Sequence, residues 1–345
     1  MTKVIKVKDV YIGGSNPISI QSMCNTKTND VESTTQQILE LENAGCEIIR
    51  VAVPDMEAAK ALAKIIPNVS IPVVADIHFD YKLALCAIEN GVHKLRINPG
   101  NIGKRENVIE VVKKAKEYKV PIRIGVNSGS IEKELLKQYG VSAKSMVLSA
   151  KRHIELLEEL DFYDICVSLK ASNVPLSIEA YELFSKEYKY PLHVGITEAG
   201  TLYRGTIKSS VGLGAILSRG IGDTIRVSLS DNPIHEIECA RYILQSLGLR
   251  KFGVEIISCP TCGRTEVDLI ALVTKVEEYT KHVNKDLKVA VMGCAVNGPG
   301  EAREADIGIA GGKNCGIIFK KGEIIRKVNE AELFTAFCEE FNKFI

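Results

Sequence analysis

The chain has 345 residues, and its 44 basic and 43 acidic side chains leave a formal net charge of +1. This balance gives no bulk electrostatic reason to expect binding to nucleic acid or to an anionic membrane. No apolar signal-peptide core follows Met1, and no run of about 18 apolar residues occurs anywhere in the sequence. Hydrophobic residues make up 46% of the chain, which is enough for a substantial core. From the length and from the lack of such apolar segments, we expect a soluble, cytoplasmic protein with one large and one small domain.

Residues 1–250 alternate short apolar runs with longer stretches of helical periodicity, the pattern of a parallel β/α fold. The expected strands are Ile18–Ser22, Ile48–Val53, Val73–Ile77, Lys94–Ile97, Ile122–Val126, Ile165–Leu169, Leu192–Ile196 and Thr224–Leu229. The expected helices between and after them include Val31–Ala44, Glu57–Ile66, Tyr81–Asn90, Asn107–Tyr118, Ala143–Leu160, Ile178–Tyr188 and Ile234–Ser246. Eight β/α units in about 250 residues predict a TIM barrel rather than an open doubly wound sheet.

Polar side chains lie inside or just after the carboxyl end of every expected strand, and a barrel brings these ends to one rim. They are Gln21 and Ser22; Arg50; Asp76 and His78; Arg96 and Asn98; Arg123 and Asn127; Lys170; His193, Thr197 and Glu198; and Arg226 and Ser228. Arginine is costly to bury unless an anion meets it, and its planar fork suits phosphate oxygens. The rim therefore predicts a site for a phosphate ester, although a structural salt bridge explains any single arginine equally well.

Three further features of the barrel region have alternative interpretations. Glu198 is the main acidic candidate among the rim cations, as a proton donor or as a balancing charge. Lys170 is placed like the Schiff-base lysine of aldolase-type barrels, but phosphate binding is the favoured interpretation. The segment Val211–Gly214 contains a lone GxG pattern, which favours helix packing over dinucleotide binding.

From about Phe252 the pattern changes, and residues 251–345 are expected to form a small α+β domain. The expected strands are Val254–Ile257, Val289–Val291, Asp306–Ile309, Gly316–Phe319 and Ile324–Lys327. One helix is expected at Val267–His282 and another from Glu330 onward. A turn is expected at residues 297–300, which would place Glu301 near Cys294. Gly311–Gly312 is expected to form another turn or, equally well, a flexible loop.

Three cysteines of the small domain form a candidate metal centre. Cys259 and Cys262 make a CxxC pair, and Cys294 lies in a later loop that is followed by Glu301. Three thiolates are too few for the usual closed structural zinc site, and a carboxylate would be an exchangeable fourth ligand. The spacing thus favours a catalytic iron–sulfur centre, while a structural zinc knuckle remains open.

The motifs around these residues resemble one known family over nearly the whole chain. Residues 258–264 (SCPTCGR) and 293–301 (GCAVNGPGE) are similar to the cluster-binding signature of the bacterial 4-hydroxy-3-methylbut-2-enyl diphosphate synthases. The barrel segments at residues 96–100, 123–127, 195–200 and 226–229 resemble that family as well. The chain is similar to the short, two-domain bacterial form.

The resemblance implies an oxidoreductase of isoprenoid biosynthesis by the methylerythritol phosphate pathway. It would convert 2-C-methyl-D-erythritol 2,4-cyclodiphosphate to 4-hydroxy-3-methylbut-2-enyl diphosphate by two-electron reductive ring opening and dehydroxylation. The resemblance also implies a 4Fe-4S cluster in residues 251–345 and substrate binding by the barrel of residues 1–250. Flavodoxin or ferredoxin would donate the electrons, and a head-to-tail homodimer would form composite active sites.

The same resemblance assigns roles to individual residues. Glu198 matches the proposed acid. The substrate-binding positions are matched by Arg50, Arg96, Arg123, Asn127, Lys170, Arg226 and Ser228, and the cluster ligands by Cys259, Cys262, Cys294 and Glu301.

Two alternatives from other functional classes remain at this stage. One is a zinc-stabilised barrel lyase or aldolase that acts on a sugar phosphate through Lys170. The other is a non-catalytic iron–sulfur sensor that binds a phosphorylated metabolite. Borohydride trapping on Lys170 would favour the first, and tight ligand binding without turnover would favour the second.

Overall fold

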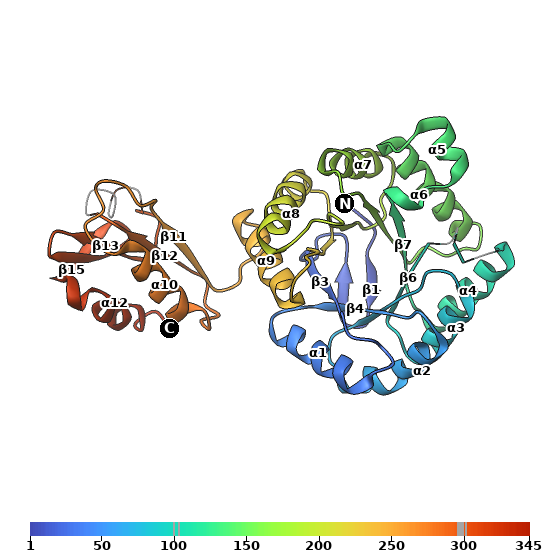
Figure 1. Cartoon of the computed structure of the whole chain (residues 1–345), viewed down its shortest axis with the longest axis horizontal. Coiled ribbons are helices and arrows are strands. Elements are labelled where there is room, and N and C mark those ends of the chain that lie inside the picture. The colour runs from blue at the N-terminus through green and yellow to red at the C-terminus, as the bar shows by residue number, and fades with distance from the viewer. Residues whose placement is uncertain (99–100, 103, 295–299, 301) are drawn as a thin grey trace. The chain divides into compact units, whose positions relative to one another are not determined.

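The structure, a computed structural model, describes residues 1–98, 101–102, 104–294, 300 and 302–345. It divides into two compact units, Met1–Arg250 and Lys251–Ile345 (Figure 1). Within the described residues, no helix has both the length and the apolar character needed to cross a membrane.

The first unit is built on an eight-stranded sheet in which all registered pairs are parallel. Its strands are β3 (Ser19–Met23), β4 (Ile48–Ala52), β5 (Val73–Asp76), β6 (Lys94–Ile97), β7 (Ile122–Asn127), β8 (Ile165–Lys170), β9 (His193–Val194) and β10 (Thr224–Ile225). They follow the order β8-β7-β6-β5-β4-β3-β10-β9, and a bridge between Val167 of β8 and Leu192 joins the two ends. The predicted TIM barrel is confirmed.

Helices surround this barrel, as Figure 1 shows. They are α1 (Val31–Asn43), α2 (Met56–Ile65), α3 (Tyr81–Glu89), α4 (Arg105–Tyr118), α5 (Lys133–Tyr139), α6 (Ala143–Glu158), α7 (Val174–Glu187), α8 (Leu202–Leu217) and α9 (Pro233–Ser246). Short 3-10 helices lie at Ile66–Asn68 and Ser128–Ser130. Aspartate side chains cap several helices: Asp30, Asp55 and Asp80 accept hydrogen bonds from first-turn backbone N–H groups and fix where α1, α2 and α3 begin.

A hairpin at the amino terminus closes the end of the barrel where the strands begin. Strands β1 (Ile5–Val7) and β2 (Val10–Ile12) pair antiparallel. Their buried side chains form one apolar cluster with Ile48, Val74 and Cys166, from the starts of three barrel strands. Any ligand must therefore enter from the opposite, carboxyl-terminal end of the strands.

Helix α8, which the sequence analysis does not place, shows why one glycine of the GxG segment is needed. A Cβ atom added to Gly212 would lie 2.5 Å from Cδ1 of Ile196. The absence of a side chain therefore lets α8 pack closely on the segment after β9. The helix-packing interpretation holds for Gly212, whereas Gly214 has no atom close enough to restrict it.

The second unit is a mixed five-stranded sheet with helices α10 (Leu269–Thr280) and α12 (Leu333–Phe341). Its strand order is β11-β12-β13-β14-β15, with the first three parallel and the last three antiparallel. The strands are β11 (Val254–Ser258), β12 (Leu287–Met292), β13 (Ile307–Gly312), β14 (Cys315–Lys320) and β15 (Glu323–Asn329), and a 3-10 helix spans Glu330–Glu332. Side chains of both helices and of β12, β13 and β14 form the core of this unit.

The turn expected at Gly311–Gly312 is wrong. Both residues belong to β13, where they pair with Gly316 and Cys315 of β14. A Cβ atom on Gly311 would lie 2.6 Å from Cγ2 of Val267. Glycine serves close packing at this position rather than a turn.

The core of the second unit yields a stability prediction. Phe337 is fully buried and stacks on Phe341, with 5.5 Å between ring centroids. Phe337→Ala should destabilise this unit by about 3–5 kcal/mol, because it removes apolar contacts and leaves a cavity. Hydrogen exchange read by mass spectrometry should show lost protection in residues 251–345 and unchanged protection in the barrel.

The matched control is Ile324→Ala, since Ile324 is 59% exposed on β15. This variant should leave protection in both units unchanged. Equal loss of protection in the barrel of Phe337→Ala would contradict a separate core for the second unit.

Candidate active site

The floor of the candidate site is a layer of three arginines inside the barrel. Side chains that point into a TIM barrel form layers, each built from alternate strands. The registered strand pairs place four residues in one such layer, here called the arginine layer: Arg50, Arg96, Ser168 and Arg226. The next layer toward the carboxyl ends, here called the upper layer, holds Met23, Asp76, Gly125 and Gly195.

Asp76 holds two of these arginines in place. Its Oδ1 lies 3.0 Å from Nη1 of Arg96, and its Oδ2 lies 3.7 Å from Nε of Arg50. Nε2 of His78 approaches the same carboxylate at 3.4 Å. Burial raises the pKa of Asp76, but Arg50, the hydrogen bond from His78 and Arg96 outweigh burial and hold this pKa below its usual value. The carboxylate is therefore charged, and it fixes both guanidinium groups.

A second carboxylate, Glu236 in the first turn of α9, holds the third arginine from behind. Its two oxygens lie 3.3 Å from Nε and Nη2 of Arg226. The hydroxyl of Ser22 and the backbone N–H of Leu229 also donate to Glu236. Ser22 thus bonds to α9 rather than to a ligand. Sequence reasoning missed Glu236, because a glutamate in a helix carries no signal of this role.

Two glycines of the upper layer make the room for a ligand. A Cβ atom on Gly125 would lie 2.6 Å from Nε of Arg96, and one on Gly195 would lie 2.8 Å from Nζ of Lys170. Larger residues at these positions would displace the cations. The sequence alone does not reveal this role, because a glycine within a strand has several explanations.

The resulting cavity has a volume of about 140 Å³ and a mainly cationic wall. Among the described residues that line it, five are arginine or lysine and one is a carboxylate, Asp76. The full lining is Arg50, Asp76, His78, Arg96, Arg123, Asn127, Ser168, Lys170, Thr197, Arg226 and Ser228. The structure thus brings together all seven residues predicted to bind substrate, and it adds Ser168. Ser168 lies two residues before Lys170 on the same strand, so the alternation of side chains between the two faces could have indicated that both enter the cavity.

Burial of these cations alters their ionisation. Burial lowers the pKa of Arg123 to about 10, with Arg96 as the next cause. Nε and Nη1 of Arg123 are buried and have no hydrogen-bond partner among the described residues. A buried guanidinium that lacks partners is unfavourable by several kcal/mol in order of magnitude. An anion in the cavity would supply the missing charge.

Lys170 is the lysine among the described residues that line the cavity. It is buried, and its Nζ lies 3.3 Å from Nε2 of His193. Burial, followed by the positive charges of Arg123 and Arg226, holds the pKa of Lys170 well below its usual value. Burial and the same cationic surroundings also hold the pKa of His193 well below its usual range, so His193 is neutral.

Not every residue of the expected rim reaches the cavity. Glu198 is exposed and is not among the lining residues, although its neighbour Thr197 is. Its backbone adopts a left-handed conformation with φ of 52°, which is uncommon for a residue other than glycine. Gln21 and His193 are buried in the layer beneath the arginines, and Asn98 is buried outside the cavity lining.

Two of the predicted cluster ligands, Cys259 and Cys294, lie at the carboxyl ends of neighbouring strands of the second sheet. Cys259 follows β11 and Cys294 follows β12 by two residues, and these strands are parallel neighbours. The backbone N–H of Gly293 donates to Sγ of Cys259 at 3.1 Å. Cys262 is exposed, and hydrogen bonds from Arg264 lower the pKa of its thiol. All three thiols are free of disulfides.

The described residues contain no group of three metal-ligating side chains already in coordination geometry. Glu301 and the expected turn at residues 297–299 lie outside the described residues. The donor chemistry nevertheless fits an iron–sulfur cluster, because free thiols at one sheet edge are the ligands that such clusters use.

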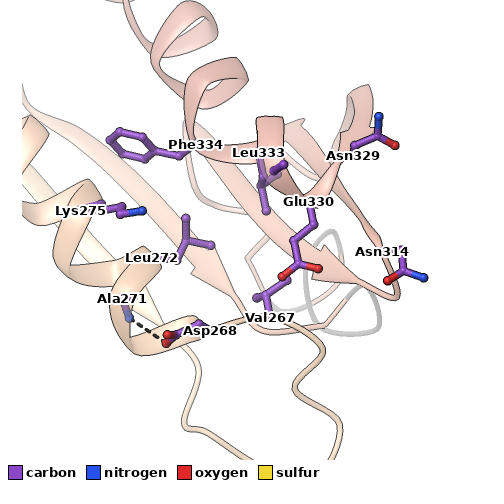
Figure 2. A pocket seen from close by; sticks show the side chains of 11 residues that line it. Val267, Asp268, Ala271, Leu272, Lys275, Asn314, Asn329, Glu330, Leu333 and Phe334 are labelled. Carbon is purple, nitrogen blue, oxygen red and sulfur yellow. Dashed lines mark hydrogen bonds between the residues drawn. The ribbon is translucent and has the colours of Figure 1, made fainter.

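A larger hollow of about 700 Å³ lies elsewhere in the second unit, between α10 and α12 (Figure 2). Its apolar lining residues include Leu272, Leu333 and Phe334. Its charged lining residues among those described are Lys275, Asp268 and Glu330, and Asp268 is engaged in capping α10. One cation beside two carboxylates does not suit a phosphate ester, so the barrel cavity is the candidate substrate site.

A nearly closed parallel barrel with a cationic cavity at the carboxyl ends of its strands defines a TIM-barrel enzyme with a site for an anionic ligand. The GcpE TIM-barrel domain matches residues 2–241, and the GcpE protein C-terminal domain matches residues 255–343. The chain therefore belongs to the GcpE family.

Relatives of known name match over their full length. A protein of Caldanaerobacter subterraneus subsp. tengcongensis is 59% identical, with 100% of this chain and 98% of the relative covered. A protein of Clostridium acetobutylicum is 58% identical, with 99% and 98% covered. Both are named 4-hydroxy-3-methylbut-2-en-1-yl diphosphate synthase (flavodoxin). They support the family resemblance that the cysteine and barrel motifs predict.

Among solved structures, the dihydropteroate synthase of Yersinia pestis is similar, with a TM-score of 0.51. It shares 11% sequence identity and covers 72% of this chain and 100% of its own. At this identity the likeness concerns the barrel fold alone.

The lowered pKa of Lys170 predicts proton uptake when an anion binds. Burial and the neighbouring arginines lower the pKa of Lys170 in the empty site, whereas a bound anion favours the charged form and raises this pKa. Between these two pKa values binding takes up a proton, so the dissociation constant of inorganic pyrophosphate should rise as the pH rises. Calorimetry in buffers of different ionisation enthalpy should find uptake of up to about one proton that Lys170→Met abolishes.

The control for this experiment is Lys6→Met, which removes an exposed lysine near the amino terminus. It should show the same proton uptake as the unmodified chain. Equal uptake in the Lys170→Met variant would assign the proton to pyrophosphate itself and contradict the role given to Lys170.

Proposed function

We propose that this chain catalyses the two-electron reductive ring opening and dehydroxylation of 2-C-methyl-D-erythritol 2,4-cyclodiphosphate to 4-hydroxy-3-methylbut-2-enyl diphosphate. The observation that carries this proposal is the barrel cavity, where five cations face one carboxylate in a chain with full-length relatives of that name. A cyclic diphosphate carries the charge that such a wall requires. From the relatives' names we also infer that flavodoxin, or a related carrier such as ferredoxin, donates the electrons.

The barrel residues would bind and orient the substrate. Arg50, Arg96 and Arg226 present guanidinium groups from the floor, while Arg123 supplies donors that lack partners among the described residues. Lys170 completes the cationic wall on the side of His193. The uncharged donors Asn127 and Ser228 would fix the position of the diphosphate through hydrogen bonds.

We assign a 4Fe-4S cluster to Cys259, Cys262 and Cys294, with Glu301 as the exchangeable fourth ligand. When bound, this cluster supplies the electrons for reduction of the substrate. The free thiols at one edge of the second sheet support the assignment. The barrel's part is to hold the diphosphate so that the carbon bearing the leaving hydroxyl faces the reductant.

Glu198 is the proposed proton donor. Its position directly after Thr197, a residue of the cavity wall, would allow its carboxyl group to protonate the departing hydroxyl oxygen. Because the side chain of Glu198 is exposed and is not part of the cavity lining, this role would require the carboxyl group to act from the mouth of the cavity.

We further propose that the active site is composite within a homodimer, with the cysteines of one subunit serving the barrel of the other. Substrate residues and proposed cluster ligands belong to two separately packed units of the chain. In a head-to-tail dimer, the barrel of each subunit would meet the cluster ligands of the other, and two identical sites would form.

The ligand assignment predicts that Cys294→Ser loses iron and sulfide after anaerobic reconstitution. A hydroxyl is a poor substitute for a thiolate ligand of iron. The barrel should be unaffected, so pyrophosphate should bind as in the unmodified chain. The matched control is Cys315→Ser, a free cysteine at the same sheet edge, which should keep its iron. Full iron content in Cys294→Ser would rule out this ligand set.

The composite site predicts complementation between two inactive variants. Arg123→Glu disables the barrel and Cys294→Ser disables the cluster, but a mixed dimer would contain one intact site. Statistical mixing of the two chains should restore about a quarter of the activity. Mixtures that stay inactive, although mass spectrometry shows that mixed dimers form, would place each active site within a single chain.

A further inference from the structure

Met23 brings two arginines of the cavity floor together. It is the last residue of β3, and its sulfur lies 3.1 Å from Nε and 2.8 Å from Nη2 of Arg50. Nη1 of Arg226 approaches the same sulfur at 3.6 Å. Arg50 belongs to β4 and Arg226 directly follows β10, and these two strands are the neighbours of β3 in the barrel. One thioether thus accepts hydrogen bonds from donors on both sides.

Met23 and Asp76 occupy equivalent positions. Both belong to the upper layer, and each lies above the gap between two arginines of the arginine layer. Asp76 contacts Arg50 and Arg96, whereas Met23 contacts Arg50 and Arg226. Arg50 is therefore held from both sides, once by a charged acceptor and once by an uncharged one.

The difference in charge matters for an anion site. Burial, the positive charge of Arg226 and other neighbouring arginines lower the pKa of Arg50, whereas Asp76 opposes this effect. Crowded guanidinium groups repel one another and need acceptors to hold them in place. A second carboxylate would hold them but would cancel charge that the ligand must meet. A thioether is a weak, polarisable acceptor and leaves the charge intact.

We propose that Met23 is a positioning residue for substrate binding, which holds Arg50 and Arg226 in the orientation that receives the diphosphate. This inference rests on the proposed function, because it concerns the same anion site. Phosphate oxygens are much stronger acceptors than a thioether, so they displace the sulfur from the guanidinium donors. The arginines then need little rearrangement when the diphosphate arrives.

A series of three substitutions tests the inference. Met23→Leu keeps the size and removes the acceptor, Met23→Gln keeps an uncharged acceptor, and Met23→Glu adds a charge. The matched control is Met146→Leu, a buried methionine in α6. Each full-length variant is titrated with inorganic pyrophosphate by calorimetry, its melting temperature is recorded, and the reconstituted enzyme is assayed for kcat and KM.

Met23→Leu should weaken pyrophosphate binding about threefold to tenfold, the effect of losing weak hydrogen bonds that orient the site. Met23→Gln should stay within about twofold of the unmodified chain, because its amide oxygen can accept from both arginines. Met23→Glu should weaken binding by more than about a hundredfold, since it neutralises part of the site. In Met23→Leu, KM should rise while kcat is retained, because the arginines hold the anion and not the reacting carbon.

Unchanged or tighter binding in Met23→Leu would overturn the inference. So would an equal loss of affinity in Met23→Gln, or in the control Met146→Leu, because either result would indicate a packing effect. Failure of the unmodified chain to bind pyrophosphate would overturn the proposed anion site and this inference together. Normal binding by the unmodified chain and by Met23→Leu would overturn the role of Met23 alone.

Discussion

The barrel cavity contains more buried positive charge than buried negative charge, and this excess determines what the site can bind. Arg50, Arg96, Arg123, Lys170 and Arg226 line one small cavity. Asp76 and Glu236 fix the arginines, but two carboxylates cannot balance five cations. A protein interior tolerates such an excess only at a cost of several kcal/mol for each unpaired ion. The fold therefore carries a penalty that a multiply charged anion removes on binding, which converts unfavourable burial into affinity for a diphosphate.

The barrel provides the means to hold these charges. Its layers place three arginines at one height, and glycines at two of the four positions above them leave space for a ligand. The hairpin β1–β2 closes the opposite end, so the cavity opens only where the strands finish. The lowered pKa of Lys170 alone would also suit a Schiff-base nucleophile. Its place among four arginines, together with the GcpE family membership, favours anion binding instead.

Strand order could be predicted from the sequence, because eight alternating strands and helices indicate a barrel. The cationic rim could also be predicted, because the parallel strands of a barrel end on the same side. Side-chain direction was harder to predict. Ser22 points outward to Glu236, and Glu198 lies exposed after Thr197, because β9 ends at Val194 and the chain then leaves the ladder. The roles of Gly125 and Gly195 depend on which side chain lies opposite, and Gly311 was misassigned for the same reason. Contacts between distant residues, such as Met23 with Arg226, leave no local pattern.

A single anaerobic reaction tests the proposed activity most directly. Reconstituted protein is incubated with 2-C-methyl-D-erythritol 2,4-cyclodiphosphate and reduced flavodoxin, and the products are followed by phosphorus NMR and mass spectrometry. We expect a linear diphosphate that has one oxygen fewer than the cyclic substrate, and therefore two fewer than the product of simple hydrolysis, and we expect Arg123→Glu to abolish its formation. Unchanged cyclic diphosphate, or a ring-opened product that keeps every hydroxyl group, would contradict the proposed activity.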